Sequence, residues 1–131
     1  MIKQNLHCHT TFDDGADTPE AMVRAAVSAG LTSLGISAHS PVPGEVWCVS
    51  EENEPRFKAE LHRLREKYCG QISVYCGLEY DSRSARRFEG YDYVIASVHA
   101  LAGTTIDNTV EEARQVIEHY GGADAAACAY Y

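Results

Sequence analysis

An alternation of short apolar segments with amphipathic helical segments is the feature that most constrains the fold of this chain. The segments with the composition of buried strands are the few residues before His7 and residues 31–37, 72–78 and 91–98. The segments with helical periodicity are residues 18–29, 54–68 and 109–120, and a glycine follows each of them within two residues. Strand, helix and strand joined by short connections are typical of parallel sheets. The pattern therefore predicts an α/β fold with about four parallel strands.

Local signals set the limits of the first predicted helix. Thr18 supplies a hydroxyl at the N-cap, and Pro19 suits the first helical position. Gly30 indicates that the helix ends there, because glycine readily adopts the left-handed conformation that follows a helix. The apolar stripe expected on this helix comprises Ala21, Met22, Ala25, Ala26 and Ala29. Further along, residues 82–90 are expected to form a loop or short helix, and residues 123–131 a last short helix.

The first strand leads into residues that can bind a metal ion. His7 and His9 stand two apart, and side chains at that spacing on a strand project from the same face. Asp13, Asp14 and Gly15 then predict a turn, which leaves one or both carboxylates beside the two histidines. The structural alternative is a pair of surface histidines on a frayed end. Two imidazoles could otherwise converge on one ion.

Each later strand carries one more such residue at its carboxyl end, namely His39, Glu79 and His99. In parallel α/β folds these ends gather on one face, where active sites form. Singly, each residue has a structural alternative: His39 as a loop residue capping a backbone group, His99 as a half-buried core residue, and Glu79 as the start of a turn. Four strand ends with metal-binding groups together favour a single metal site. His62 and His119 lie among charged helical neighbours and are assigned to the surface.

The combination of imidazoles and carboxylates indicates a class of reaction. Neutral imidazole suits zinc, iron or manganese, and a carboxylate such as Glu79 can bridge two ions. Two or more ions close together can generate hydroxide and hold a phosphoryl group during in-line displacement. A covalent mechanism is disfavoured, because no Ser or Cys stands in a recognisable elbow or next to a partnered histidine in the sequence. The residues therefore predict phosphoester hydrolysis.

Charge and cysteine content narrow the partners and the compartment. The net charge is −8, from 11 basic and 19 acidic side chains, which disfavours an extended nucleic-acid surface. The weak basic cluster Arg83, Arg86 and Arg87 is assigned to the solvated surface rather than to substrate binding. The five cysteines are odd in number and form no CxxC pair, so we expect mostly small buried side chains in a reducing cytoplasm. We expect no signal peptide or membrane span, since no apolar run is long enough.

Several motifs resemble those of the PHP (polymerase and histidinol phosphatase) superfamily. His-Cys-His-Thr-Thr-Phe-Asp-Asp-Gly at residues 7–15 resembles its first motif, and the segment from Gly30 to Pro41 resembles its second. Gly-Leu-Glu at residues 77–79 and the strand ending in Ser-Val-His at residues 97–99 are similar to its later motifs. The proline after His39, the Ser-Val-His segment and the closing residues 120–131 resemble the histidinol-phosphatase branch most.

The resemblance implies a distorted TIM-like barrel whose site binds up to three divalent ions. The implied activity is a metal-dependent phosphomonoester hydrolysis, that of L-histidinol phosphate in histidine biosynthesis, with a metal-bound hydroxide held by His7, His9 and Glu79. Position by position, the implied ligands are His7 and His9 at a first site, Asp14 and His39 at a second, Glu79 as a bridge and His99 at a third. Asp14 is preferred to Asp13 because the acid of the motif directly precedes its glycine.

The chain departs from the family pattern in two respects. Family members are about twice as long, and their later strands supply a further histidine and an Asp-x-His pair. The acid that usually precedes the second-motif histidine is Ala38 here, a change expected to weaken the site. We therefore expect residues 1–131 to form a single PHP domain, the amino-terminal portion of the family barrel with about four βα units. It would be a fragment of a longer protein, or a homo-oligomer joined through open sheet edges.

Two other functions stay open on the sequence alone. One is a PHP phosphoesterase that acts on a different phosphate ester or on nucleic-acid ends, although the acidic balance disfavours a nucleic-acid partner. The other is a catalytically inactive half-barrel that binds few metal ions or none. The identity of the metal is not determined by the sequence, because sites of histidine and carboxylate accept several ions.

Overall fold

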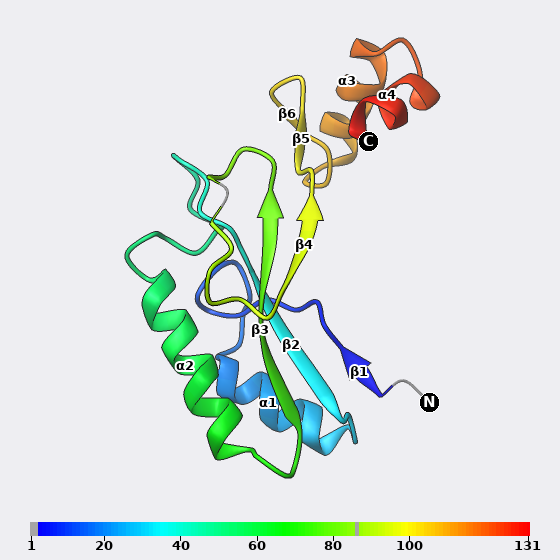
Figure 1. Cartoon of the computed structure of the whole chain (residues 1–131). Coiled ribbons are helices and arrows are strands. Elements are labelled where there is room, and N and C mark those ends of the chain that lie inside the picture. Colours follow the sequence, from blue (N-terminus) through cyan, green and yellow to red (C-terminus); the bar gives the residue numbers. More distant parts are fainter. Residues whose placement is uncertain (1–2, 86) are drawn as a thin grey trace. The chain divides into compact units, whose positions relative to one another are not determined.

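The computed structural model describes residues 3–85 and 87–131, which form two compact units. The first unit is Met1–Ala96 and the second is Ser97–Tyr131. The elements that begin in the first unit are β1 (Gln4–Asn5), α1 (Pro19–Ser28), β2 (Ser33–His39), α2 (Glu54–Lys67), β3 (Ser73–Asp81) and β4 (Tyr93–Ser97) (Figure 1). This alternation of strands and helices confirms the predicted α/β class.

The four strands form one sheet in the order β1-β2-β3-β4. β1 pairs with β2 and β2 with β3 in parallel, and the arrows of β3 and β4 run the same way in Figure 1. The pairing of β2 with β3 runs from Ser33 opposite Ser73 to His39 opposite Glu79. This register brings His39 and Glu79 side by side at one end of the sheet.

The start of α1 follows its sequence signals. Thr18 is the N-cap, and its hydroxyl accepts the backbone N–H of Ala21 at 3.3 Å. Pro19 opens the helix, where its missing N–H costs no hydrogen bond. Beyond the C-cap, Gly30 has a φ of 74°, the left-handed conformation that ends a helix.

The apolar stripe predicted for α1 is partly wrong. Ala26 is buried as expected, but the other two buried residues of the helix are Pro19 and Val23. Three of the predicted stripe residues, Ala21, Ala25 and Ala29, are exposed. Val23 has the larger apolar side chain, so its burial decides which face of the helix turns inward.

The core of the first unit joins both helices to one face of the sheet. α2 contributes Phe57, Leu61 and Leu64, which are fully buried as its periodicity predicts. From β2 the same cluster takes Leu34, Ile36 and Ala38. Because side chains alternate along a strand, His39 projects from the opposite face.

The limits of β3 and β4 differ from those predicted. β3 continues through Asp81, so Glu79 lies inside the strand and not beyond its end. β4 begins at Tyr93, two residues later than expected. The residue before it, Asp92, donates its N–H to the carbonyl of Cys76 at 2.8 Å, and its carboxylate accepts the N–H of Cys76 at 2.7 Å. The side chain of Asp92 therefore replaces a backbone partner of β3 at the point where β4 was expected to have begun already.

Tyr93 lies across the face of β2 and β3 that carries the predicted site residues. A Cβ atom at Gly35 would stand 2.1 Å from the Tyr93 hydroxyl, and one at Gly77 would stand 2.3 Å from its Cζ. The hydroxyl donates to the carbonyl of Leu6 at 2.6 Å. The two glycines thus make room for a ring that ties β4 to the segment after β1.

The second unit contains β5 (Ala100–Leu101), β6 (Thr104–Thr105), α3 (Val110–His119) and α4 (Ala123–Tyr130). Both helices were expected, and Thr109 caps α3 by accepting the N–H of Glu112 at 3.2 Å. The antiparallel hairpin of β5 and β6 was not predicted. Its turn residues, Ala102 and Gly103, have φ of 49° and 78°, which fits a two-residue turn with both residues left-handed.

The cysteines are all free. Cys8, Cys48 and Cys76 are buried, as small apolar side chains would be, whereas Cys69 and Cys128 are exposed. Within the described residues, no helix has the length and apolar character needed to cross a membrane.

Candidate metal centre

The segment after β1 places two imidazoles together. The ring centroids of His7 and His9 are 5.3 Å apart. Cys8 between them is buried, and its thiol contacts the carbonyl of Gly35 at 3.3 Å. Burial, together with the charge of Asp13, raises the pKa of Cys8 to about 11, so the thiolate form that binds metals is not populated at neutral pH. The two histidines therefore offer the ligand atoms of this segment.

One carboxylate oxygen of Glu79 contacts three imidazoles. Oε2 lies 2.8 Å from Nε2 of His7, 3.2 Å from Nε2 of His9 and 3.3 Å from Nδ1 of His39. Burial by itself raises the pKa of Glu79, but hydrogen bonds from His9 and His7 and the charges of the histidines outweigh it and lower the pKa to about 2. Glu79 is thus ionised at neutral pH, the form in which a carboxylate can bridge ions.

A second group of donors lies on the other side of the His39 ring. Nε2 of His39 is 3.7 Å from Oδ1 of Asp14, and the same oxygen is 3.6 Å from Nδ1 of His9. The rings of His9 and His39 stack with centroids 4.3 Å apart. The distances from Asp14 to these two nitrogens are longer than a hydrogen bond. They are close to the separation of two ligand atoms that bind one ion at about 2 Å each.

Asp13 is buried next to this group. Its Oδ2 lies 2.7 Å from Nδ1 of His9 and accepts the backbone N–H of His39 at 3.1 Å. Its Oδ1 accepts the N–H of Thr10 at 2.9 Å. Hydrogen bonds to Asp13 and to Glu79 raise the pKa of His9 to about 10, against the opposing effect of burial.

The described residues of the first unit thus form two groups that could hold a divalent ion. The groups are His7, His9 and Glu79, and His9, Asp13, Asp14 and His39, with ligand atoms within 4.8 Å of one another in each. Imidazole nitrogen combined with carboxylate oxygen suits zinc, iron or manganese. A buried carboxylate that gathers three imidazoles fits a metal centre chemically, because the ion would take the place of the protons that hold these groups together.

His99, the sixth predicted ligand, belongs to the second unit. There its Nδ1 lies 2.7 Å from Oδ2 of Asp107, and its Nε2 lies 2.9 Å from Oγ of Ser97. A carboxylate on one ring nitrogen is the usual partner of a metal-binding histidine. Its place among the ligands stays a prediction.

The loop between β2 and α2 adds a residue that the sequence did not identify as functional. Trp47 lies edge-on to His39, with ring centroids 4.9 Å apart and planes at 89°. Its indole N–H donates to Glu45 at 2.8 Å, and the guanidinium of Arg83 lies 5.7 Å from its ring. The available signal was a lone tryptophan in a loop that directly follows a strand-end histidine.

Of the arginines after β3, the two that the structure describes, Arg83 and Arg87, pair with carboxylates. Arg83 pairs with the fully buried Asp81 at 3.0 Å and with Glu45 at 3.2 Å. Arg87 is exposed and lies 3.7 Å from Glu51. Arg86 lies outside the described residues. Arg83 therefore anchors the end of β3, since two carboxylates already neutralise its charge.

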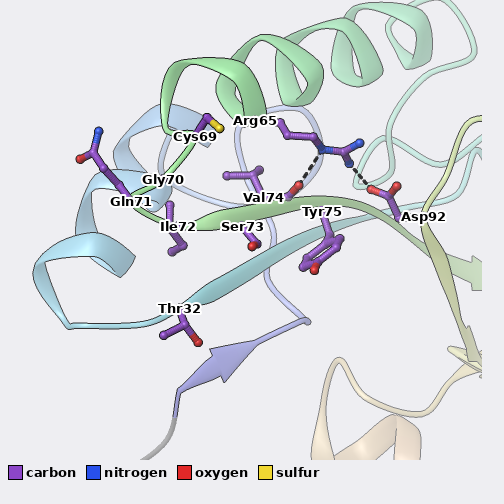
Figure 2. Close-up of a pocket in the computed structure, with 10 residues that line it drawn as sticks. All are labelled: Thr32, Arg65, Cys69, Gly70, Gln71, Ile72, Ser73, Val74, Tyr75 and Asp92. Carbon is purple, nitrogen blue, oxygen red and sulfur yellow. Dashed lines mark hydrogen bonds and ion pairs between the residues drawn. The ribbon is translucent and has the colours of Figure 1, made fainter.

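A separate hollow of about 500 Å³ lies beside the amino-terminal end of β3 (Figure 2). Arg65 crosses it, donating to the carbonyl of Val74 at 2.9 Å and pairing with Asp92. None of its lining residues belongs to the two groups of candidate ligands. Arg65 and Asp92 thus form hydrogen bonds with backbone groups of β3 before β4 begins to pair with it.

Metal binding by the two groups is expected to release protons and to tighten as the pH rises. With a pKa of about 10, His9 is protonated at neutral pH in the metal-free protein. An ion must displace that proton to bind Nε2, so we expect affinity to rise by up to about tenfold per pH unit between about pH 7 and 9. Glu79 stays ionised throughout this range and adds no pH dependence.

Competition titrations with a chromophoric zinc chelator at several pH values would measure this slope. Calorimetry in buffers of different ionisation enthalpy would count the protons released. Zinc affinity that stays constant from about pH 7 to 9 would contradict the assignment of His9 as a ligand.

The chain matches the family described as PHP domain over residues 5–129. It is 32% identical over 114 residues to a curated Deinococcus radiodurans protein named "Probable histidinol-phosphatase", covering 78% of this chain and 44% of that protein. It is 28% identical over 91 residues to a histidinol-phosphatase of Bacillus subtilis, covering 62% and 34% of the two chains. The chain spans less than half the length of these curated relatives.

Solved structures of similar fold include a candidate histidinol phosphatase from Listeria monocytogenes. It aligns with a TM-score of 0.83 and 22% identity over 98% of this chain and 58% of that one. A histidinol phosphate phosphatase from Lactococcus lactis, solved with zinc, L-histidinol and phosphate, aligns with a TM-score of 0.66 and 24% identity over 90% and 51%. The family match and these structures confirm the resemblance seen in the motifs and the predicted fold.

Proposed function

We propose that this chain, which belongs to the PHP domain family, carries the amino-terminal part of a metal-dependent phosphomonoester hydrolase. The proposed substrate is L-histidinol phosphate, hydrolysed to histidinol and phosphate in histidine biosynthesis. The names of the curated relatives and the ligands of the Lactococcus lactis protein support this choice. The domain proposed is a single PHP domain, of which residues 1–131 are the amino-terminal portion.

The observation that carries the proposal is the carboxylate of Glu79 held between three imidazoles. A buried glutamate with a pKa of about 2 keeps its charge and faces His7, His9 and His39. Such a group can bridge ions bound by the histidines on either side. An ordinary core would not place four ionisable side chains around one point.

The ligands proposed are His7, His9, Asp14, His39, Glu79 and His99. Bound divalent ions supply the Lewis acidity that activates water and neutralises phosphoryl oxygens. The parallel register of β2 and β3 sets His39 beside Glu79, which supports these two residues as neighbouring ligands. Trp47 packs edge-on against His39, with ring centroids 4.9 Å apart.

We further propose a cytoplasmic location and self-association. Free cysteines, three of them buried, suit a reducing compartment. Within the described residues, β1 and β4 are the outer strands of the four-stranded sheet, and unpaired edges promote association between chains. Mass measurement in solution tests the second part.

Release of inorganic phosphate from L-histidinol phosphate by the zinc-loaded chain tests the function. Glycerol phosphate, p-nitrophenyl phosphate and a nucleoside monophosphate serve as comparison substrates. We expect histidinol phosphate to be preferred and His7→Ala to reduce turnover by at least about 100-fold. His62→Ala is the matched control, because His62 is an exposed histidine on α2.

Preference for another ester would replace the proposed substrate and keep the reaction class. A chain that binds zinc in full but releases no phosphate from any ester would overturn the proposal. That result would favour the catalytically inactive half-barrel.

A further inference from the structure

We propose that Asp13 is a positioning residue that orients two metal ligands from different strands, His9 and His39. The inference rests on the proposed function, because it concerns the ligands of the proposed metal centre. The motif resemblance assigns the ligand role to the neighbouring Asp14 and leaves Asp13 without a role. The contacts of the two carboxylates separate their roles.

Asp13 binds protein groups through both of its oxygens. Oδ2 contacts Nδ1 of His9 at 2.7 Å and the N–H of His39 at 3.1 Å, and Oδ1 accepts the N–H of Thr10 at 2.9 Å. The side chain is 0% exposed. Three short contacts to a buried carboxylate leave Oδ2 with both lone pairs used.

The contact with His9 decides which ring nitrogen faces an ion. Because Nδ1 of His9 donates to Asp13, Nε2 is the nitrogen turned toward Glu79, at 3.2 Å. A carboxylate on the second nitrogen fixes the orientation of a metal-binding imidazole and raises its basicity. Asp13 therefore aims Nε2 of His9 at the group that contains His7 and Glu79.

The contact with His39 connects this turn to β2. By accepting the backbone N–H of His39, Asp13 holds the last residue of β2 against the turn that carries Asp14. Ala38, where the family usually has an acid, is 0% exposed in the core cluster, on the other face of β2. A side chain at position 38 does not reach the ligands in this arrangement, so the orienting carboxylate comes from position 13.

Asp14 differs in each of these respects. Its side chain is 49% exposed, and its nearest histidine nitrogens stand 3.6 and 3.7 Å away. It can thus take an ion between itself and His39. The chain offers these two adjacent aspartates as a matched pair, one positioning and one ligating.

Zinc binding by Asp13→Asn and Asp14→Asn tests the inference. Asparagine keeps the shape of the side chain, but cannot accept all three hydrogen bonds. For Asp13→Asn we expect zinc affinity to fall by about 10- to 100-fold, with the number of ions per chain unchanged. For Asp14→Asn we expect the number of ions to fall by about one, because a ligand is lost. The visible absorption spectrum of the cobalt-loaded protein should also change in Asp13→Asn, since the His9 ring is no longer held.

A purely structural role for Asp13 would lower the unfolding temperature of the metal-free variant and leave the affinity of the folded fraction unchanged. Unchanged affinity, or loss of an ion as in Asp14→Asn, would overturn the inference while the wild-type chain still binds zinc. A wild-type chain that binds no zinc would instead overturn the proposed function.

Proton NMR of the metal-free wild-type chain keeps the inference testable if Asp13→Asn does not fold. We expect a strongly downfield, slowly exchanging proton on Nδ1 of His9, because a buried carboxylate 2.7 Å away accepts it. Its absence would overturn the inference without any variant.

Discussion

Zinc binding by the Glu79→Gln variant is expected to be more than about 100-fold weaker than binding by the wild-type chain. Glutamine keeps the volume of the side chain and removes its charge. The carboxylate of Glu79 has one oxygen within 3.3 Å of His7, His9 and His39, so the first group of ligands loses a member and His39 loses its contact with that group. The loss should exceed that from an orienting residue, because Glu79 is proposed to bind the ions directly. Titration against a competing chelator gives the two affinities.

The phosphatase activity of this variant should fall with its metal content. Loss of several kcal/mol of transition-state stabilisation by the ions corresponds to a rate lower by roughly 10²- to 10³-fold. His62→Ala again serves as the control that should retain both properties, since its side chain is 69% exposed. Glu79→Gln with wild-type zinc affinity would rule out the bridging role.

Zinc is expected to raise the unfolding temperature of the wild-type chain strongly. An ion that binds only the folded state adds about 4 kcal/mol of stability at 1,000 times its Kd. For a chain of 131 residues this corresponds to a rise on the order of 10 °C. The shift should be larger at pH 8 than at pH 6, roughly following the displacement of the proton on His9.

Thermal scans with zinc and with excess chelator would measure this rise. The exposed thiols Cys69 and Cys128 are best replaced by serine, so that zinc acts at the proposed centre alone. Equal unfolding temperatures in the two scans would contradict a metal centre. An equal rise in Glu79→Gln would show that the zinc binds elsewhere.

Much of the fold follows from signals within short stretches of sequence. Thr18, Gly30 and Thr109 mark helix ends where the structure has them. The rule that short strand–helix–strand connections make parallel sheets was enough to predict the arrangement of β1, β2 and β3. Val23 was missed because the alanine-rich sequence of α1 allows several apolar faces.

The candidate site was predictable as a set of residues but not as a geometry. Strand-end histidines can be found in the sequence, yet the register of β2 on β3 cannot. A slip of one residue would set Ala38 opposite Glu79 and turn His39 toward the core. The roles of Asp13 and Trp47 depend on tertiary contacts with His9 and His39, and no local pattern encodes them.

The metal content of the purified chain is the most direct test of the proposed metal centre. Elemental analysis after incubation with zinc and removal of free ion, with the solution mass recorded on the same sample, gives ions per folded chain. We expect about two or three ions per chain, and a marked loss in Glu79→Gln. A folded chain without bound metal would contradict it, because the gathered imidazoles and carboxylates would then not form a metal centre.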